Sequence, residues 1–231
     1  MKQGTENSDY RKFAQQAEER SNIYGFLSVV YSHVVTAEFL EKVREEDLAK
    51  TLRELGVVLD EILDVKDDEK LLEKLAVEYT RLYIGPGHHI PPFESVYSDA
   101  QESAGKKILG LMGGKAAKAI SRELASHGYK LAPKFKGMSD HIAAELALMR
   151  FLALEEREAW ERNSKEEALT LLSSQQKFLK EHLVRWTPEF CDRARDYAKL
   201  KFYETIAALT KEFVLSEDKT LPELIKTAEQ V

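Results

Sequence analysis

The sequence has only one cysteine and no long apolar run. The cysteine, Cys191, excludes an internal disulfide and any zinc site built from cysteines alone. No apolar run approaches the roughly 18 residues that a membrane-spanning helix needs. The amino terminus also lacks the apolar segment of a secretory signal peptide. We therefore expect a cytoplasmic protein without direct membrane insertion.

Basic residues are not gathered into a block, although the chain has 34 Lys and Arg against 40 Asp and Glu. Nucleic-acid-binding proteins usually present a basic stripe, so this distribution argues against a nucleic-acid partner. The net charge of −6 is compatible with a basic peptide as partner, because acidic surfaces attract cations.

No segment alternates apolar and polar residues as a half-buried strand would, whereas helical spacing recurs along the whole chain. One face over 10–32 is apolar, and similar stripes follow in 71–82 and 142–152. We predict an all-α fold of roughly eight to ten helices, because about that many capped, periodic segments can be counted. The chain is expected to form a single domain over 1–231.

Several helix starts are predicted from local signals. Thr187 followed by Pro188 is typical of a helix start, and Thr220 with Glu223 forms a capping box that would open a short terminal helix. A third signal, Ser164 in a capping box with Glu167, predicts a helix whose inward face comprises Leu169, Leu172, Gln176 and Leu179.

The main interruption of the helical pattern lies at 85–97, where the chain reads G-P-G-H-H-I-P-P-F-E-S-V-Y. Glycine and proline end the preceding helix, and Pro91 with Pro92 favours an extended path. The sequence therefore predicts a stiff loop within a long Pro/Gly-rich connection, with a possible internal seam at 85–114.

Four of the eleven glycines fall within 105–114, which raises the question of a phosphate-binding loop. The P-loop pattern requires glycine where Leu109 stands and Ser or Thr where Ala116 stands. A flexible connection is the better interpretation.

Histidines and carboxylates offer one alternative function, a helical metal-binding enzyme. His141 and Glu145 are four residues apart and share a helix face, and the loop contributes His88 and His89. These residue types bind transition metals, but the spacing supplies only two ligands on one element. Hydrogen bonding of the same side chains within the fold is the competing interpretation.

Two stretches together resemble the TorD/DmsD/NarJ family of redox-enzyme maturation chaperones. The first reads E-Y-T-R-L-Y-I-G-P over 78–86 and continues as P-P-F-E-S-V-Y over 91–97. The second reads S-D-H-I-A-A-E-L-A-L-M over 139–149. Departures from the family's usual residues occur at four positions: Tyr83, Phe93, Ser139 and Leu148.

The resemblance implies an all-helical cytoplasmic chaperone without catalytic activity or a cofactor of its own. Its partners would be the twin-arginine signal peptide and the body of a molybdopterin-type redox-enzyme precursor. It would assist cofactor insertion and delay export. One branch of the family serves a membrane-anchored nitrate reductase, so the motifs leave the client open, and they do not predict the oligomeric state.

A receiver for such a leader needs carboxylates for two guanidinium groups and a groove for the apolar segment. Glu94, Asp140 and Glu145 could supply the charge if the loop packs beside the helix that begins near 140. In the alternative, Asp140 and Glu94 only fasten the loop by hydrogen bonds. The candidate peptide-binding residues are Tyr83, Pro91, Pro92, Phe93, Glu94, Ser95, Tyr97, Asp140, His141 and Glu145.

Overall fold

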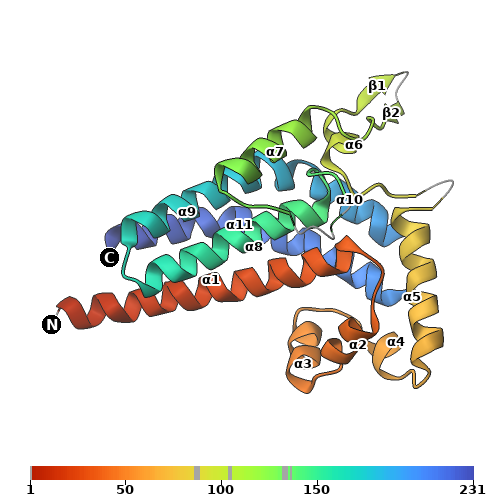
Figure 1. Cartoon of the computed structure of the whole chain (residues 1–231), viewed down its shortest axis with the longest axis horizontal. Helices are drawn as coiled ribbons and strands as arrows, with labels where there is room; N and C mark the ends of the chain where they lie inside the picture. The colour runs from red at the N-terminus through yellow and green to blue at the C-terminus, as the bar shows by residue number, and fades with distance from the viewer. Residues whose placement is uncertain (1, 86–88, 104–105, 132–134, 136) are drawn as a thin grey trace.

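The computed structural model describes residues 2–85, 89–103, 106–131, 135 and 137–231, and it is overwhelmingly helical, which confirms the predicted all-α fold (Figure 1). The helices before the 85–114 segment are α1 (Lys2–Ser32), α2 (Ala37–Val43), α3 (Glu46–Glu54), α4 (Asp60–Leu63) and α5 (Asp68–Tyr83). After α6 (Glu94–Ser98) the chain continues through α7 (Lys115–Ser126), α8 (Ile142–Glu161), α9 (Lys165–Phe178), the π-helix η1 (Leu179–Leu183), α10 (Val184–Tyr197) and α11 (Lys201–Gln230). Among these described residues, no helix has an apolar stretch long enough to cross a lipid bilayer.

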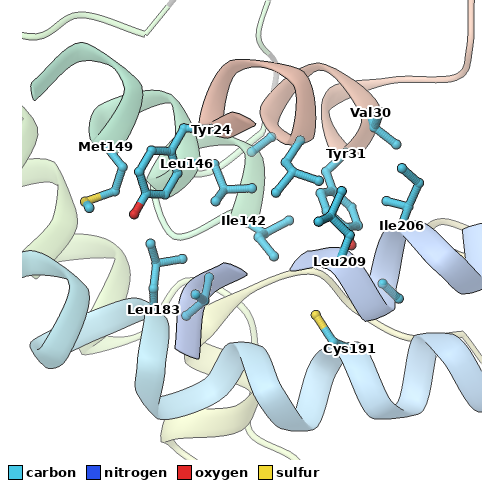
Figure 2. Close-up of a cluster of buried hydrophobic side chains, with 14 of the residues drawn as sticks. Tyr24, Val30, Tyr31, Ile142, Leu146, Met149, Leu183, Cys191, Ile206 and Leu209 are labelled. Carbon is cyan, nitrogen blue, oxygen red and sulfur yellow. The ribbon is translucent and has the colours of Figure 1, made fainter. Parts of the chain in front are cut away.

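The core forms where α1 lies along α8 and both pack onto the helices α9 to α11 (Figure 1). The apolar stripes predicted from helical spacing point into it. Figure 2 shows side chains from α1, α8, η1, α10 and α11 around one centre. They include Tyr24, Tyr31, Ile142, Leu146, Met149, Leu183, Cys191 and Ile206, each at most 1% exposed. Their burial from water is the main favourable contribution to the fold.

The short helices α2 to α4 and the helix α5 lie beside this bundle (Figure 1). Two tyrosine hydroxyls connect α5 to the bundle: that of Tyr79 donates to the carbonyl of Tyr31 at 2.7 Å, and that of Tyr203 donates to the carbonyl of Leu75 at 3.2 Å. Buried hydroxyls of this kind need a partner, and both find one in the backbone.

Two predicted helix starts are wrong, because Pro188 and Pro222 lie inside helices. Residues 187–188 fall within α10, which continues directly from η1, and 220–223 fall within α11. Both helices bury side chains on either side of the proline, and that packing outweighs the lost backbone hydrogen bond. Ser164 does precede α9, but its side chain makes no capping hydrogen bond.

The inward face of α9 is also shifted from the prediction. Gln175 is fully buried, whereas Gln176 and Leu169 are only partly buried. Gln175 lies three residues after the buried Leu172 and four before the buried Leu179, so it occupies a regular position in the stripe.

The 85–114 segment contains more regular structure than a stiff loop. Residues 94–98 form α6, and β1 (Gln101–Ser103) pairs antiparallel with β2 (Lys106–Ile108). Gly110 accounts for part of the glycine enrichment. Its N–H donates to the carbonyl of Val96 at 2.8 Å, and a Cβ on this residue would lie only 2.7 Å from the carbonyl oxygen of Ser95. Close backbone approach to α6, rather than flexibility, requires glycine at this position.

Candidate functional site

Backbone hydrogen bonds join the two sequence motifs. The N–H of Glu94 donates to the carbonyl of Asp140, and the N–H of Ile142 donates to the carbonyl of Pro92, both at 2.9 Å. Phe93 and His141 therefore face each other as an isolated β-bridge. The segment 91–97 lies beside the start of α8, as the sequence predicts.

Side chains of the second motif cap the helices that meet here. One carboxylate oxygen of Asp140, Oδ2, accepts from the N–H of Ser95 at 3.2 Å, which satisfies a free donor in the first turn of α6. His141 is the N-cap of α8, and its Nδ1 accepts from the N–H of Ala143 at 3.1 Å. The hydroxyl oxygen of Ser95 accepts from the N–H of Gly113 at 3.0 Å, so α6 also holds the turn before α7.

Three buried carboxylates gather at this junction: Glu94, Asp140 and Glu145 are at most 3% exposed. Glu94 Oε2 lies 2.8 Å from Nδ1 of His182, and the indole N–H of Trp186 donates to Glu145 Oε2 at 3.2 Å. No Arg or Lys among the described residues forms an ion pair with any of the three. We call these three carboxylates, with His182 and Trp186, the junction cluster.

The environment of the junction cluster disfavours charge on Glu145. Burial raises the pKa of the Glu145 carboxyl well above its usual value, and the nearby charges of Glu94 and Asp140 raise it further. Burial likewise lowers the pKa of His141 to about 4, so its imidazole is neutral at pH 7 and can accept the hydrogen bond at Nδ1.

Several polar atoms around the junction have no hydrogen-bond partner among the described residues. They are Oδ1 of Asp140, Oε1 of Glu145, Oγ1 of Thr187 and the hydroxyls of Tyr83 and Tyr97. Buried polar atoms are usually paired, because an unpaired one costs free energy. The buried polar groups of this region are thus less completely hydrogen-bonded than those of an ordinary protein core.

Most of the predicted peptide-binding residues lie inside the protein. Tyr83 and Tyr97 pack among aromatic rings, with Tyr97 stacked on Trp186 at a centroid distance of 5.5 Å. Pro91 and Phe93 are partly exposed. The buried members of the predicted set are Tyr83, Pro92, Glu94, Ser95, Tyr97, Asp140, His141 and Glu145.

The metal-binding alternative gains no ligand set from the described part of the chain. His88 lies outside the described residues, and within them no three His, Cys, Asp or Glu side chains come together as metal ligands. The buried thiol of Cys191 is a core group whose pKa burial raises.

Sequence reasoning does not assign His182 or Trp186 to the site. They lie four residues apart, across the boundary of η1 and α10, so they share a face of that continuous helix. Neither residue belongs to a sequence motif. The only signal in the sequence is that both occupy inward-facing positions of the helix. A π-helix next to such a cluster is typical of functional sites.

A separate open groove of about 470 Å³ lies between α1, α2, α3 and α8. Its apolar lining includes Phe26, Val29, Phe39, Val43 and Leu48, and none of the predicted peptide-binding residues contributes to it.

Comparisons with known proteins show which proteins this chain resembles. A family model described as nitrate reductase delta subunit matches residues 42–192, which contain both motifs. The chain is 24% identical over 223 residues to chaperone protein TorD of Vibrio cholerae, covering 90% of this chain and 94% of that one. It is 27% identical over 175 residues to chaperone protein TorD of a Psychrobacter species, covering 74% and 72%. A crystal structure described as that of a redox enzyme maturation protein from Archaeoglobus fulgidus covers 85% of this chain and 93% of its own, with 19% identity and a TM-score of 0.49.

Proposed function

The chain belongs to the nitrate reductase delta subunit family, and from that premise we propose that it binds the twin-arginine signal peptide and the body of a molybdopterin-type redox-enzyme precursor. This is a family of redox-enzyme maturation chaperones and not of catalysts. In the proposed role the protein acts in the cytoplasm, assists cofactor insertion and delays export of its client.

The observation that carries the proposal is the position of the junction within the family match. Segments 91–97 and 139–149 both fall inside 42–192, and the hydrogen bonds of Glu94 and Ile142 join them into one unit. The similarity to proteins named chaperone TorD extends over 90% of the chain, so it is not confined to these motifs.

We assign different roles to the exposed and buried members of the predicted site. Pro91 and Phe93 are partly exposed and contact the apolar part of the leader. The buried members hold this edge in place. Glu94 and Asp140 also create a region of negative potential beneath it, because no Arg or Lys in the described chain pairs with them, whereas burial disfavours charge on Glu145.

Calorimetry with candidate leader peptides tests the arginine recognition. A leader with its Arg-Arg pair should bind, and the same leader with Lys-Lys should bind more weakly. Lysine keeps the charge but lacks the planar fork that pairs with a carboxylate through two hydrogen bonds. A scrambled leader that binds as well as the intact one would refute the proposal.

The location of the site is tested with Phe93→Ala, which should weaken leader binding by roughly tenfold, as expected for a partly buried aromatic contact. Val29→Ala is the matched control, because Val29 is 41% exposed and lines the separate groove between α1 and α2. Weakening by Val29→Ala with no effect of Phe93→Ala would move the leader to that groove.

A further inference from the structure

The turn before α7 exposes two large apolar side chains that no part of the proposed function uses. Leu111 is 87% exposed and Met112 is 57% exposed. The turn is flanked by Gly110 and Gly113, and Gly113 has φ +88°, a left-handed conformation that favours glycine. The backbone of the turn is anchored to α6. The N–H of Gly113 donates to the hydroxyl oxygen of Ser95, and the N–H of Gly110 donates to the carbonyl of Val96. The apolar pair is therefore held outward by an anchored turn.

A basic face on α7 follows immediately. Lys115, Lys118 and Arg122 are exposed and spaced three and four residues apart, so they share one side of the helix. The opposite side buries Ala116, Ile120 and Leu124 against the protein.

The basic face of α7 is not neutralised by acidic residues of the same helix. Glu123 is the only acid in α7, and it turns toward Lys177 at 3.2 Å and His127 at 4.0 Å. Within the described residues, no ion pair involves Lys115, Lys118 or Arg122.

The charge of this region differs in sign from that of the protein. Over 99–127 the sequence has five Lys and Arg and three Asp and Glu, a net charge of +2 in a chain of net charge −6. Figure 1 shows α7 and the β1–β2 hairpin together at one edge of the molecule.

We propose that this edge docks the protein peripherally, without a membrane-spanning segment, on an anionic lipid bilayer. Leu111 and Met112 enter the interface between headgroups and acyl chains, and the basic face of α7 lies over the anionic headgroups. Peripheral binding generally needs two weak signals acting together, here an apolar insertion and a basic patch. A twin-arginine leader is itself cationic, so the basic face does not suit it and this edge is distinct from the leader site.

Co-sedimentation with vesicles provides the test. Wild-type protein should bind vesicles of equal parts phosphatidylglycerol and phosphatidylcholine, should not bind pure phosphatidylcholine, and should be released by added salt because exposed charges are screened. Leu111→Ser with Met112→Ser should weaken binding about tenfold, since the insertion is lost. Lys118→Glu with Arg122→Glu should weaken it by about tenfold or more, because each cation near the surface contributes independently.

Matched controls exist elsewhere on the surface. Val77 on α5 is 62% exposed, so Val77→Ser removes a comparable apolar group. Lys50 and Arg53 on α3 are exposed and three residues apart, so Lys50→Glu with Arg53→Glu makes the same charge change at another helix. Both controls should bind vesicles like wild type, and all variants should keep the leader affinity measured by calorimetry.

Selective loss of vesicle binding in the α7-edge variants supports the proposal. Absence of wild-type binding, equal binding to neutral vesicles, or equal losses in the controls overturns it. If the α7-edge variants instead lose leader binding while vesicle binding is absent, the edge belongs to the client and the membrane proposal fails.

Discussion

Two buried polar clusters in this protein differ in how their charges are balanced. The first joins α1, α8, α9 and α11 through Arg20, which lies 2.6 Å from Glu156, 3.0 Å from Gln175 and 3.9 Å from Glu217. Burial lowers the pKa of Arg20, but the two carboxylates outweigh this effect and raise the pKa above its usual value. We call these four residues the Arg20 cluster.

In the junction cluster, by contrast, no Arg or Lys of the described residues pairs with the three carboxylates. Their partners are His182, the indole N–H of Trp186, the N–H of Ser95 and the hydroxyl of Ser98, and two of their oxygens have none among the described residues. The Arg20 cluster pairs opposite charges on helices that are far apart in sequence, as a structural crosslink does. The junction cluster holds carboxyl groups in the interior without a cationic Arg or Lys among the described residues, at a cost in stability, and it lies within the range that matches the family model. Strongly perturbed pKa values cluster at functional sites, and Glu145 has one. The difference between the clusters can be tested by removing one group at a time.

The largest effect is expected from Arg20→Met, which keeps most of the aliphatic volume but removes the only Arg or Lys that pairs with Glu156 and Glu217 among the described residues. Two buried carboxylates then lose their counter-charge, and the free energy of unfolding should fall by about 3–5 kcal/mol. Urea unfolding followed by circular dichroism measures the loss. Arg53→Met on the exposed side of α3 is the control and should change stability little. A small loss in Arg20→Met would mean that water already reaches the Arg20 cluster.

Sequence patterns predict the helices of the bundle but not this first cluster. The stripe of α1 includes Phe13, Ala17 and Tyr24, and Arg20 lies three residues after Ala17 and four before Tyr24, within the same stripe. A charged residue in an apolar register is a signal of a buried ion pair, yet its partners lie more than 130 residues away and follow no local spacing. Tertiary packing alone brings them together.

The junction is more predictable, because each of its halves carries a sequence motif. The contact between the motifs is predicted correctly, whereas the exposure of their side chains is not apparent from the sequence. Pattern matching shows which residue types occur together but not which of them face water. Proline signals fail at Pro188 and Pro222 for a related reason: the burial of side chains such as Phe190 and Leu221 is decided by the whole fold.

A smaller effect is expected from His182→Ala, which removes the partner of Glu94 in the junction cluster. Among the described residues, Glu94 would keep only the hydroxyl of Ser98, at 3.3 Å, so a buried carboxylate would be left poorly satisfied. The free energy of unfolding should fall by about 1–3 kcal/mol. Urea unfolding measures this, and hydrogen exchange of the α6 amides should locate the loss at the junction. The exposed His33 provides the control variant His33→Ala.

The smallest effect, and the only stabilising one, is expected from Glu145→Gln. The folded protein raises the pKa of Glu145, so its carboxyl binds a proton more tightly when folded than when unfolded. Such a group lowers stability as pH rises from its unfolded pKa, about 4.3, through its folded pKa. Glutamine does not titrate and still offers an oxygen to the indole N–H of Trp186. The variant should therefore exceed wild type by about 1–2 kcal/mol at mildly alkaline pH, and this gain should vanish as the pH falls toward the unfolded pKa.

The corresponding change in the other cluster, Glu156→Gln, should have the opposite sign. Glu156 accepts from Arg20, from Gln175 at 2.8 Å and from Trp160 at 3.1 Å, so its negative charge is used and its removal destabilises. Urea unfolding of both variants across the pH range compares the two clusters directly. If Glu145→Gln destabilises like Glu156→Gln, the negative charge at the junction is compensated, and the cost inferred for that cluster does not exist. If the signs differ and Glu145→Gln also weakens binding of the leader peptide, the stability given up at the junction serves recognition.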